Sequence, residues 1–311
     1  MQIGLGPIFH PMSPEAGSIT GLFSVVLIIC GVILCIVTFL VGYCICRCRA
    51  KPGAPEPKQV FGDRKLEITW TAIPLAIVIF IFGLTARVMR GMDPPASAKP
   101  DLIVTGHQWW WEVRYPAEGV EAANEIHIPT GKPLLLRVES ADVIHDFWVP
   151  QLARKTHAVP GHPNDIWLQA DHPGTYLGAC ADYCGTQHSW MRFLIIAESN
   201  EAFDSWVRQQ IQPLPANEEG AAGRGRKVFQ QYVCMNCHAV SGLSTNGTAG
   251  PDLTHVAGRQ TLGGGVVDNT SENLARWLEN PQAIKPGCLM PGFNLTKQQA
   301  RDLTVFFEET K

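Results

Sequence analysis

The segment CADYCGTQHSWM, residues 180–191, sets the strongest constraint on this chain of 311 residues. Cys180 and Cys184 are four positions apart, His188 follows four residues later, and Met191 three after that. Thiolate, imidazole and thioether together are soft ligands of the kind that copper selects. A site for one copper ion uses a single cysteine, so two thiols suit two metal ions that share bridging sulfurs. The alternative is a disulfide between the two cysteines.

Each metal ion would also need a nitrogen ligand, and the segment supplies only His188. A second histidine must then come from elsewhere in the chain. His145 lies in ESADVIHDFWVP, just before an expected strand and 35 residues upstream of Cys180. Four others compete with it, although each is more typical of a surface or hydrogen-bonded histidine: His107, His157, His162 and His172. Spacing alone does not choose among them.

Short apolar runs surround the segment. Glycine, proline and aspartate separate these runs and no helical period is sustained, which predicts a β-sandwich. The expected strands lie within 102–115, 125–131, 133–140, 147–150, 165–170, 174–180 and 191–199. From Ser97 to Gln212 the chain carries 8 basic and 14 acidic residues, a net charge of −6.

Two long apolar stretches precede this region. Gly21–Cys46 has 26 residues and Ile68–Ala86 has 19, all uncharged, so each could cross the ~30 Å hydrocarbon core as a helix. A cleaved signal peptide is the alternative for the first, but no basic residue precedes Arg47. Basic residues outnumber Glu56, Asp63 and Glu67 between the spans, which predicts a cytoplasmic loop and both termini outside. These basic residues are Arg47, Arg49, Lys51, Lys58, Arg64 and Lys65.

The C-terminal part of the chain has a different pattern. Apolar residues recur at helical spacing in 225–240, 271–280 and 296–310, which predicts an all-α domain. From Asn217 onward it carries 9 basic and 9 acidic residues, so it has no net charge. Residues 213–223 have the composition of a linker.

This part contains CMNCH, residues 234–238, a pattern typical of covalent haem attachment. Cys234 and Cys237 would form thioether bonds, and His238 would then bind the iron as an axial ligand. A zinc knuckle or a redox dithiol is the alternative. Met290, in the proline-bounded loop KPGCLMP at residues 285–291, is the candidate for the sixth ligand, which electron transfer requires.

The pattern CMNCH…GPDLTH…RWLENPQAIKPGCLMPGF resembles a class I c-type cytochrome. The resemblance implies that the carbonyl oxygen of Pro251 accepts the Nδ1 proton of His238 and so fixes the imidazole.

The pattern HQWWWEV…DVIHDFWVP…KTHAVPGH…PGTYLGACADYCGTQHSWM, behind two membrane spans, resembles subunit II of the haem-copper cytochrome c oxidases. The resemblance covers about Gly17 to Ser199. It implies a cupredoxin fold that holds the dinuclear copper centre called CuA. The implied ligands are the bridging thiolates of Cys180 and Cys184 and the imidazoles of His145 and His188, one on each copper ion. Two weak axial ligands complete the set, Met191 and the backbone carbonyl of Asp182.

Three further residues gain roles from this resemblance. The family usually has glutamate at the position of Asp182, and the carboxylate of that glutamate binds Mg²⁺ at the boundary with subunit I. The resemblance implies the same role for the carboxylate of Asp182, although aspartate is one methylene shorter. Trp109, in a run of tryptophans that would otherwise be core aromatics, is implied as the surface residue through which electrons pass from cytochrome c. Glu67 matches a glutamate at the cytoplasmic mouth of a proton pathway, although charged residues at the edge of a span often only snorkel.

Together these features predict a multi-domain protein of the bacterial inner membrane. We expect a tail and helical hairpin in 1–96, with helices at about 21–46 and 68–90, a cupredoxin domain in 97–212, a linker in 213–223 and a cytochrome c domain in 224–311. The copper and haem domains would lie on the periplasmic side. Expected partners are oxidase subunit I and other oxidase subunits, membrane lipid, and an upstream cytochrome or quinol-oxidising complex as electron donor, but no nucleic acid.

Electrons would pass from the haem to the copper pair and on to subunit I, where oxygen is reduced and protons are pumped. A membrane-anchored copper-delivery protein of the thioredoxin type is the alternative, but it would not need His188 and Met191 in one loop. A quinol-oxidase subunit would lack the copper ligands. A nitrous-oxide reductase would need a catalytic domain for which the chain has no room.

Overall fold

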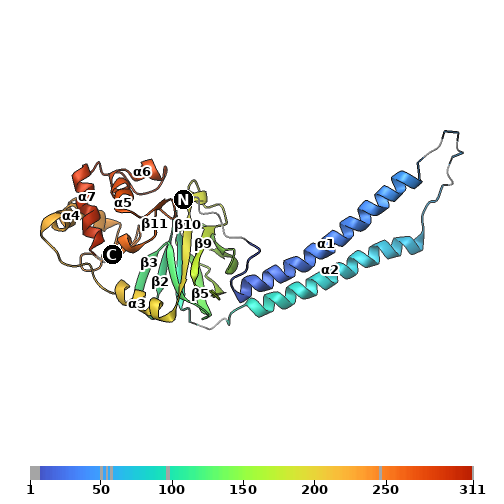
Figure 1. Cartoon of the computed structure of the whole chain (residues 1–311), viewed down its shortest axis with the longest axis horizontal. Helices are drawn as coiled ribbons and strands as arrows, with labels where there is room; N and C mark the ends of the chain where they lie inside the picture. Colours follow the sequence, from blue (N-terminus) through green and yellow to red (C-terminus); the bar gives the residue numbers. More distant parts are fainter. Residues whose placement is uncertain are drawn as a thin grey trace. The chain divides into compact units, whose positions relative to one another are not determined.

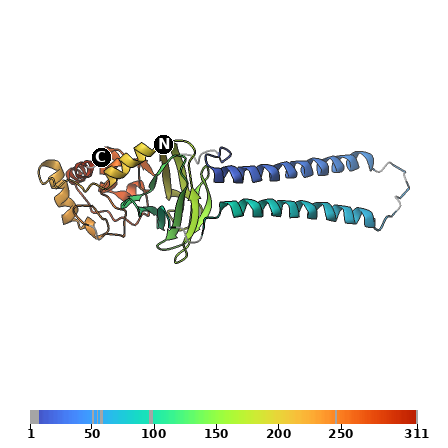
Figure 2. The same ribbon diagram turned by 90° about the horizontal axis from the view of Figure 1, so that it is seen from below.

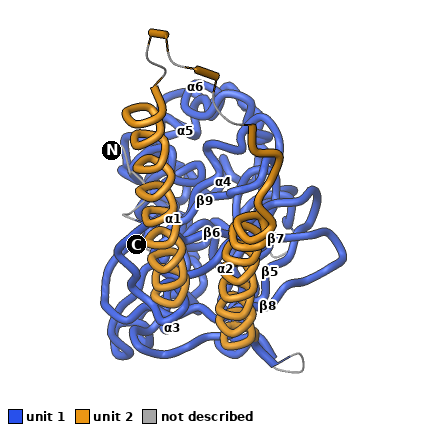
Figure 3. The backbone as a smooth tube through the Cα atoms, turned by 90° about the vertical axis from the view of Figure 1, so that its right-hand side faces the viewer, with its two compact units in different colours: residues 1–16, 94–311 blue, residues 17–93 orange. Residues whose placement is uncertain are grey.

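The computed structural model describes residues 8–49, 52–53, 55–56, 59–95, 99–244 and 247–309. Lys51 and Lys58 of the expected cytoplasmic loop lie outside the described residues, as does the expected domain boundary at 96–97. The chain divides into two compact units, residues 17–93 and residues 1–16 with 94–311 (Figure 3). The second unit contains both the strands and the C-terminal helices.

Two long helices make up almost all of the first unit, and they run side by side (Figures 1 and 2). Helix α1 spans Pro14–Arg47 and helix α2 spans Arg64–Met92. Both extend beyond the uncharged stretches because polar residues cap them. The Ser13 hydroxyl accepts a hydrogen bond from the Ala16 amide, and the Asp63 carboxylate accepts from the amides of Lys65 and Leu66. Both helices are long and apolar enough to cross a membrane.

The strands form two five-stranded sheets in the part of the second unit that we call the β-domain, residues 99–210. The first sheet has the order β3-β2-β1-β5-β8, and the second has the order β4-β10-β9-β6-β7. The strands are β1 (Leu102–His107), β2 (Trp110–Tyr115), β3 (Val120–Ala123), β4 (Glu125–Pro129), β5 (Leu134–Ser140), β6 (His145–Val149), β7 (Ala153–Ala158), β8 (Asn164–Leu168), β9 (Gly174–Cys180) and β10 (Arg192–Glu198). Strands β3 and β7 lie outside the segments expected from the sequence.

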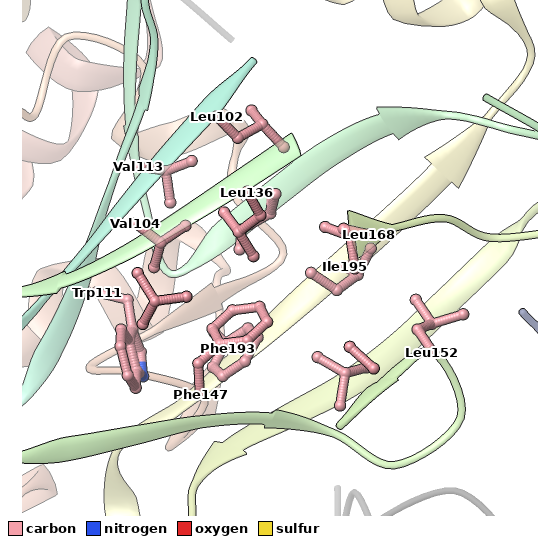
Figure 4. Close-up of a cluster of buried hydrophobic side chains, with 14 of the residues drawn as sticks. Leu102, Val104, Trp111, Val113, Leu136, Phe147, Leu152, Leu168, Phe193 and Ile195 are labelled. Atoms are coloured by element: carbon pink, nitrogen blue, oxygen red, sulfur yellow. The ribbon is translucent and has the colours of Figure 1, made fainter. Parts of the chain in front are cut away.

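The apolar side chains of the two sheets meet in one core (Figure 4). Strand β2 alternates half-buried and buried residues, as a strand with one face on a core must. The fully buried ring of Trp111 on β2 contacts Phe147 and Phe193 edge-on, with ring centroids 5.9 and 5.5 Å away. A short helix, α3 (Asn200–Gln210), follows β10 and begins at the capping residue Ser199.

The remaining residues, 220–309, form what we call the helical domain. Helices α4 (Gly220–Gln231), α5 (Ser271–Glu279), α6 (Pro281–Ile284) and α7 (Lys297–Glu308) gather in one group (Figure 1). Short 3-10 helices η2 (Cys234–Asn236) and η3 (Val256–Gly258) connect them. The domain also contains a ribbon of two-residue strands, β11 (Thr261–Leu262) and β12 (Val267–Asp268), which the helical patterns did not predict. Helix α4 starts inside the segment expected as a linker.

Candidate metal centre and haem site

The loop that joins β9 to β10, residues 180–191, is closed at its base by the pairing of these two strands. Cys180 ends β9, and its amide donates a hydrogen bond of 2.9 Å to the carbonyl of Met191. A 3-10 helix, η1 (His188–Trp190), fills the end of the loop. This ligand loop therefore turns back on itself and directs its sulfur and imidazole groups to one point.

The donor atoms of the ligand loop lie close together. The sulfurs of Cys180 and Cys184 are 3.7 Å apart, and both thiols are buried. The Sγ atom of Cys184 lies 3.7 Å from Nδ1 of His188 and 3.7 Å from Sδ of Met191. The Sγ atom of Cys180 lies 3.2 Å from the backbone oxygen of Asp182.

The fifth side chain, His145, comes from a neighbouring strand. Strand β6 pairs with β9 so that Phe147 lies opposite Cys180, which brings His145 to the same end of the sheet. Its Nδ1 atom lies 3.9 Å from Sγ of Cys180, and its ring is fully buried. None of the four competing histidines joins this cluster; the group that could hold a metal among the described residues contains His145, Cys180 and Cys184.

Asp142 holds the ring of His145 from the other side, at 2.8 Å from Nε2. A carboxylate accepts, so Nε2 carries the proton and the lone pair of Nδ1 points toward the sulfurs. Burial opposes the charge of Asp142, but hydrogen bonds from His145, Val143 and Gln108 together lower its pKa. Asp142 was not among the residues predicted from the sequence, although its place three residues before His145 was a signal for such an orienting group.

The donors fit a pair of soft metal ions that share two sulfurs. Two sulfur ligands of one tetrahedral ion, each at about 2.3 Å, lie about 3.8 Å apart, close to the observed 3.7 Å. A disulfide needs about 2.05 Å, and both thiols are free. The donors also include two imidazoles, those of His145 and His188, and two weaker ligands, Met191 and the Asp182 carbonyl, so that each ion would have one of each kind.

The thiols of Cys180 and Cys184 shift each other's pKa in opposite directions. A hydrogen bond from Cys184 lowers the pKa of Cys180 to about 3, against the opposing effect of burial, and the pKa of Cys184 is raised in turn. One thiolate is therefore already favoured at neutral pH. Metal ligation requires thiolates, so this arrangement reduces the proton cost of binding.

The carboxylate of Asp182 contacts a histidine outside the proposed ligand set. It lies 3.3 Å from Nδ1 of His157, which is also 3.2 Å from the carboxylate of Asp146. Burial raises the pKa of Asp146 to about 6. The side chain of Asp182 is half-exposed, and its role in binding Mg²⁺ stays a prediction.

The haem-binding candidates line one cavity of about 340 Å³ with mainly apolar walls. Cys234, Cys237, His238, Pro251 and Met290 all contribute to its lining. Buried residues of α4, α5 and α7 close its inner side, as a porphyrin requires: Phe229, Leu274, Leu278, Leu303 and Phe307. The structure thus brings together every residue predicted for the haem.

His238 is oriented by one backbone contact. Its Nδ1 atom lies 2.8 Å from the carbonyl oxygen of Pro251. A carbonyl only accepts, so Nδ1 carries the proton and Nε2 keeps its lone pair for an iron ion. Burial lowers the pKa of His238, which keeps the ring neutral. Cavity and tautomer therefore fit a covalently held haem.

Trp109 lies between the two sites. It lines the haem cavity, together with Gln108 and Trp110 of the β-domain. Its indole N–H donates a 3.0 Å hydrogen bond to the carbonyl of Cys184, which also accepts one of 2.7 Å from Gln108. Trp109 is half-buried. Glu67 belongs to the other unit and lies in the first turn of α2, where a negative charge is favourable.

The chain is similar to known proteins over almost its whole length. Residues 2–85 match the family model described as cytochrome C oxidase subunit II, transmembrane domain, and residues 117–199 match its periplasmic domain. A cytochrome c oxidase subunit 2 of Alkalihalophilus pseudofirmus is 35% identical over 309 residues, which cover 97% of this chain and 90% of the relative. The chain belongs to the cytochrome c oxidase subunit II family.

Other comparisons extend this result. Residues 222–311 match the cytochrome c family. A quinol oxidase subunit 2 of Bacillus cereus is 33% identical, covering 67% of this chain and 74% of the relative. The crystal structure of the periplasmic domain of subunit II of cytochrome oxidase from Bradyrhizobium japonicum is 31% identical, covers 36% of this chain and 95% of that one, and has a TM-score of 0.35.

These matches confirm both the family and the fold class expected from the sequence. The fold class is a helical hairpin, a cupredoxin-like β-domain and a helical cytochrome c domain. The chain is a subunit of an oxidoreductase and an integral membrane protein. The subunit II match implies a copper centre, and the cytochrome c match implies a haem. The roles of the individual ligands, of Trp109 and of Glu67 remain predictions.

Proposed function

We propose that this chain is the subunit through which electrons enter a terminal respiratory oxidase of the bacterial inner membrane. A dinuclear copper centre and a covalent haem c, when bound, supply one-electron redox chemistry. The haem would receive electrons from an upstream cytochrome or quinol-oxidising complex, and the copper pair would deliver them to subunit I for the reduction of oxygen with proton pumping.

One observation carries this proposal: a single side chain joins the two candidate sites. Trp109 lines the cavity that contains Cys234, Cys237, His238 and Met290, and its N–H reaches the carbonyl of Cys184. A short route of covalent bonds and one hydrogen bond therefore leads from this cavity, through Trp109, to Cys184, one of the proposed bridging thiolates. Trp109 is accordingly better described as an internal relay than as a surface residue for a soluble donor.

The protein groups around the metal ligands would fix the geometry and limit rearrangement. Cys180 and Cys184 would bridge the copper ions, with His145 and His188 as the nitrogen ligands. Met191 and the Asp182 carbonyl would be the weak axial ligands. Asp142 and the Pro251 carbonyl each hold an imidazole in one tautomer. A buried and hydrogen-bonded ligand set has little freedom to move when its charge changes, which favours fast electron transfer.

Three finer assignments belong to the same proposal. The domains would be 1–96, 97–212 and 224–311, with the copper and haem domains on the periplasmic side. Glu67 would lie at the cytoplasmic entrance of a proton path. Asp182 would support Mg²⁺ at the boundary with subunit I, beside the other oxidase subunits and lipid.

The alternative, a membrane-anchored copper-delivery protein, is less well supported. Delivery requires a site that releases its metal, whereas His145 and Met191 are fully buried and the thiols nearly so. A quinol oxidase subunit remains a relative by sequence, but the complete donor set in the ligand loop favours a copper-bearing subunit.

Single-turnover reduction of the purified oxidase tests the proposal. A reductant delivered to the haem should reduce the copper centre in a second, slower phase. Trp109→Phe, which keeps an aromatic ring but removes the indole N–H, should slow this phase at unchanged haem and copper content. The matched control Trp167→Phe, on β8, should not. Copper reduction that precedes haem reduction would contradict the proposal.

A further inference from the structure

The β-domain and the helical domain share specific polar contacts within one compact unit. The Glu125 carboxylate accepts hydrogen bonds from the amides of Gln260 and Thr261, at 2.7 and 3.0 Å. The Arg192 amide donates one of 3.1 Å to the carbonyl of Gly264. The helical domain therefore contacts the β-domain directly through β11 and the residues on either side of it, in addition to being connected to it by the linker.

The most unusual group at this interface is Lys285. Its side chain belongs to the helical domain, yet its residue is only 3% exposed. Its ammonium donates to three backbone oxygens, Trp109 O and Trp190 O at 3.2 Å and Gly263 O at 2.7 Å. An ammonium has three donors, so these three acceptors satisfy it. Lysine is almost never buried unless it is paired in this way.

Two acceptors of Lys285 belong to residues next to the proposed copper site. Trp109 reaches Cys184 with its indole, and Trp190 immediately precedes Met191. Lys285 itself begins the loop 285–291, which carries Met290. The next residue, Pro286, accepts a second bond at the same place, from the side chain of Gln187 in the ligand loop. One ammonium thus joins the loop of the proposed haem ligand to both flanks of the proposed copper site.

We propose that Lys285 is a positioning residue that holds the haem domain on the copper domain in the pose for electron transfer. This inference rests on the proposed transfer from haem to copper. A linker alone would supply the haem domain at a millimolar effective concentration and require a search before each transfer. A domain held by Lys285 needs no search, so transfer should not depend on solvent viscosity.

Amide hydrogen exchange in the assembled oxidase tests the contact without reference to activity. A hydrogen bond from a charged donor is strong enough to change an opening equilibrium about tenfold or more. Lys285→Met should therefore raise exchange at the amides of Arg192, Gln260 and Thr261 by about tenfold or more. Lys285→Gln keeps two hydrogen-bond donors and should show a smaller rise in exchange. If Lys285→Met loses its haem, the same comparison is made with Lys285→Gln. Lys297→Met, at an exposed lysine of α7, should change nothing.

The rate of transfer from haem to copper tests the consequence in the same proteins. In the unaltered oxidase we expect this rate to be independent of added viscogen. In Lys285→Met it should fall about tenfold and decrease further as viscosity rises. Unchanged exchange and an unchanged, viscosity-independent rate in Lys285→Met would overturn the role of Lys285 alone. Absence of transfer from haem to copper in the unaltered oxidase would instead overturn the proposed function.

Discussion

Gly106 on β1 lies against the ring of His145, and Gly106→Ala perturbs the proposed copper site without replacing any of the proposed ligand residues. The added Cβ would lie 2.7 Å from Cδ2 of His145 and 3.2 Å from the ring of Trp111, whereas ordinary contact begins at 3.4 Å. The imidazole would have to move by about 0.7 Å. It is held on its other side by Asp142 at 2.8 Å, so it cannot simply rotate away.

The expected result is a damaged metal site in a folded protein. Overpacking a core typically costs about 1–3 kcal/mol, and ligand geometry must be held within about 0.5 Å. We therefore expect the purified oxidase to unfold at a lower temperature and to show a reduced copper content with an altered electron paramagnetic resonance spectrum. Gly258→Ala is the control, because no atom lies within 4 Å of its added Cβ. A Gly106→Ala oxidase with the copper content and spectrum of the unaltered protein would show that Gly106 does not determine the position of His145.

Three further predictions concern the helical domain, and thermal unfolding followed through haem absorption checks each. Gly225→Ala should destabilise the domain by about 1–3 kcal/mol, because its Cβ would lie 2.1 Å from the Asp302 carbonyl where α4 crosses α7. Thr296→Ala should cost about 1 kcal/mol, because it removes the capping box that Thr296 forms with Gln299. Hydrogen bonds from Arg224 lower the pKa of Asp302, so its contribution to stability is present at neutral pH and is lost as pH falls below about 4. Asp302→Asn should therefore lose less stability on acidification than the unaltered protein does.

The sequence predicts the local features of this protein well, because they depend on neighbouring residues. The alternation in WWEVRY matches the burial of β2, and the uncharged stretches predict both long helices. The strands that escaped prediction are β3, VEAA, which is short and rich in alanine, and β7, ARKTHA, which is too polar to show a strand pattern. Their places are set by pairing with β2 and β6, which tertiary packing decides.

The candidate sites also combine residues that local sequence predicts with residues whose places depend on tertiary packing. Most proposed copper ligands share one loop, so their spacing alone suggested a metal. His145 could not be separated from four other histidines by spacing, because its place depends on the pairing of β6 with β9. Lys285 carried no signal at all, since lysine normally stays in water. Its partners are backbone oxygens far away in sequence, which no side-chain pattern reveals.

Electron paramagnetic resonance of the oxidised oxidase, combined with copper and haem counts, tests whether Cys180 and Cys184 hold a pair of copper ions in a chain that also carries a haem. We predict hyperfine structure from one unpaired electron shared by two equivalent copper nuclei, and its loss in Cys184→Ser. Hyperfine structure from a single copper nucleus, or a Cys184→Ser protein that retains the shared signal, would contradict the account.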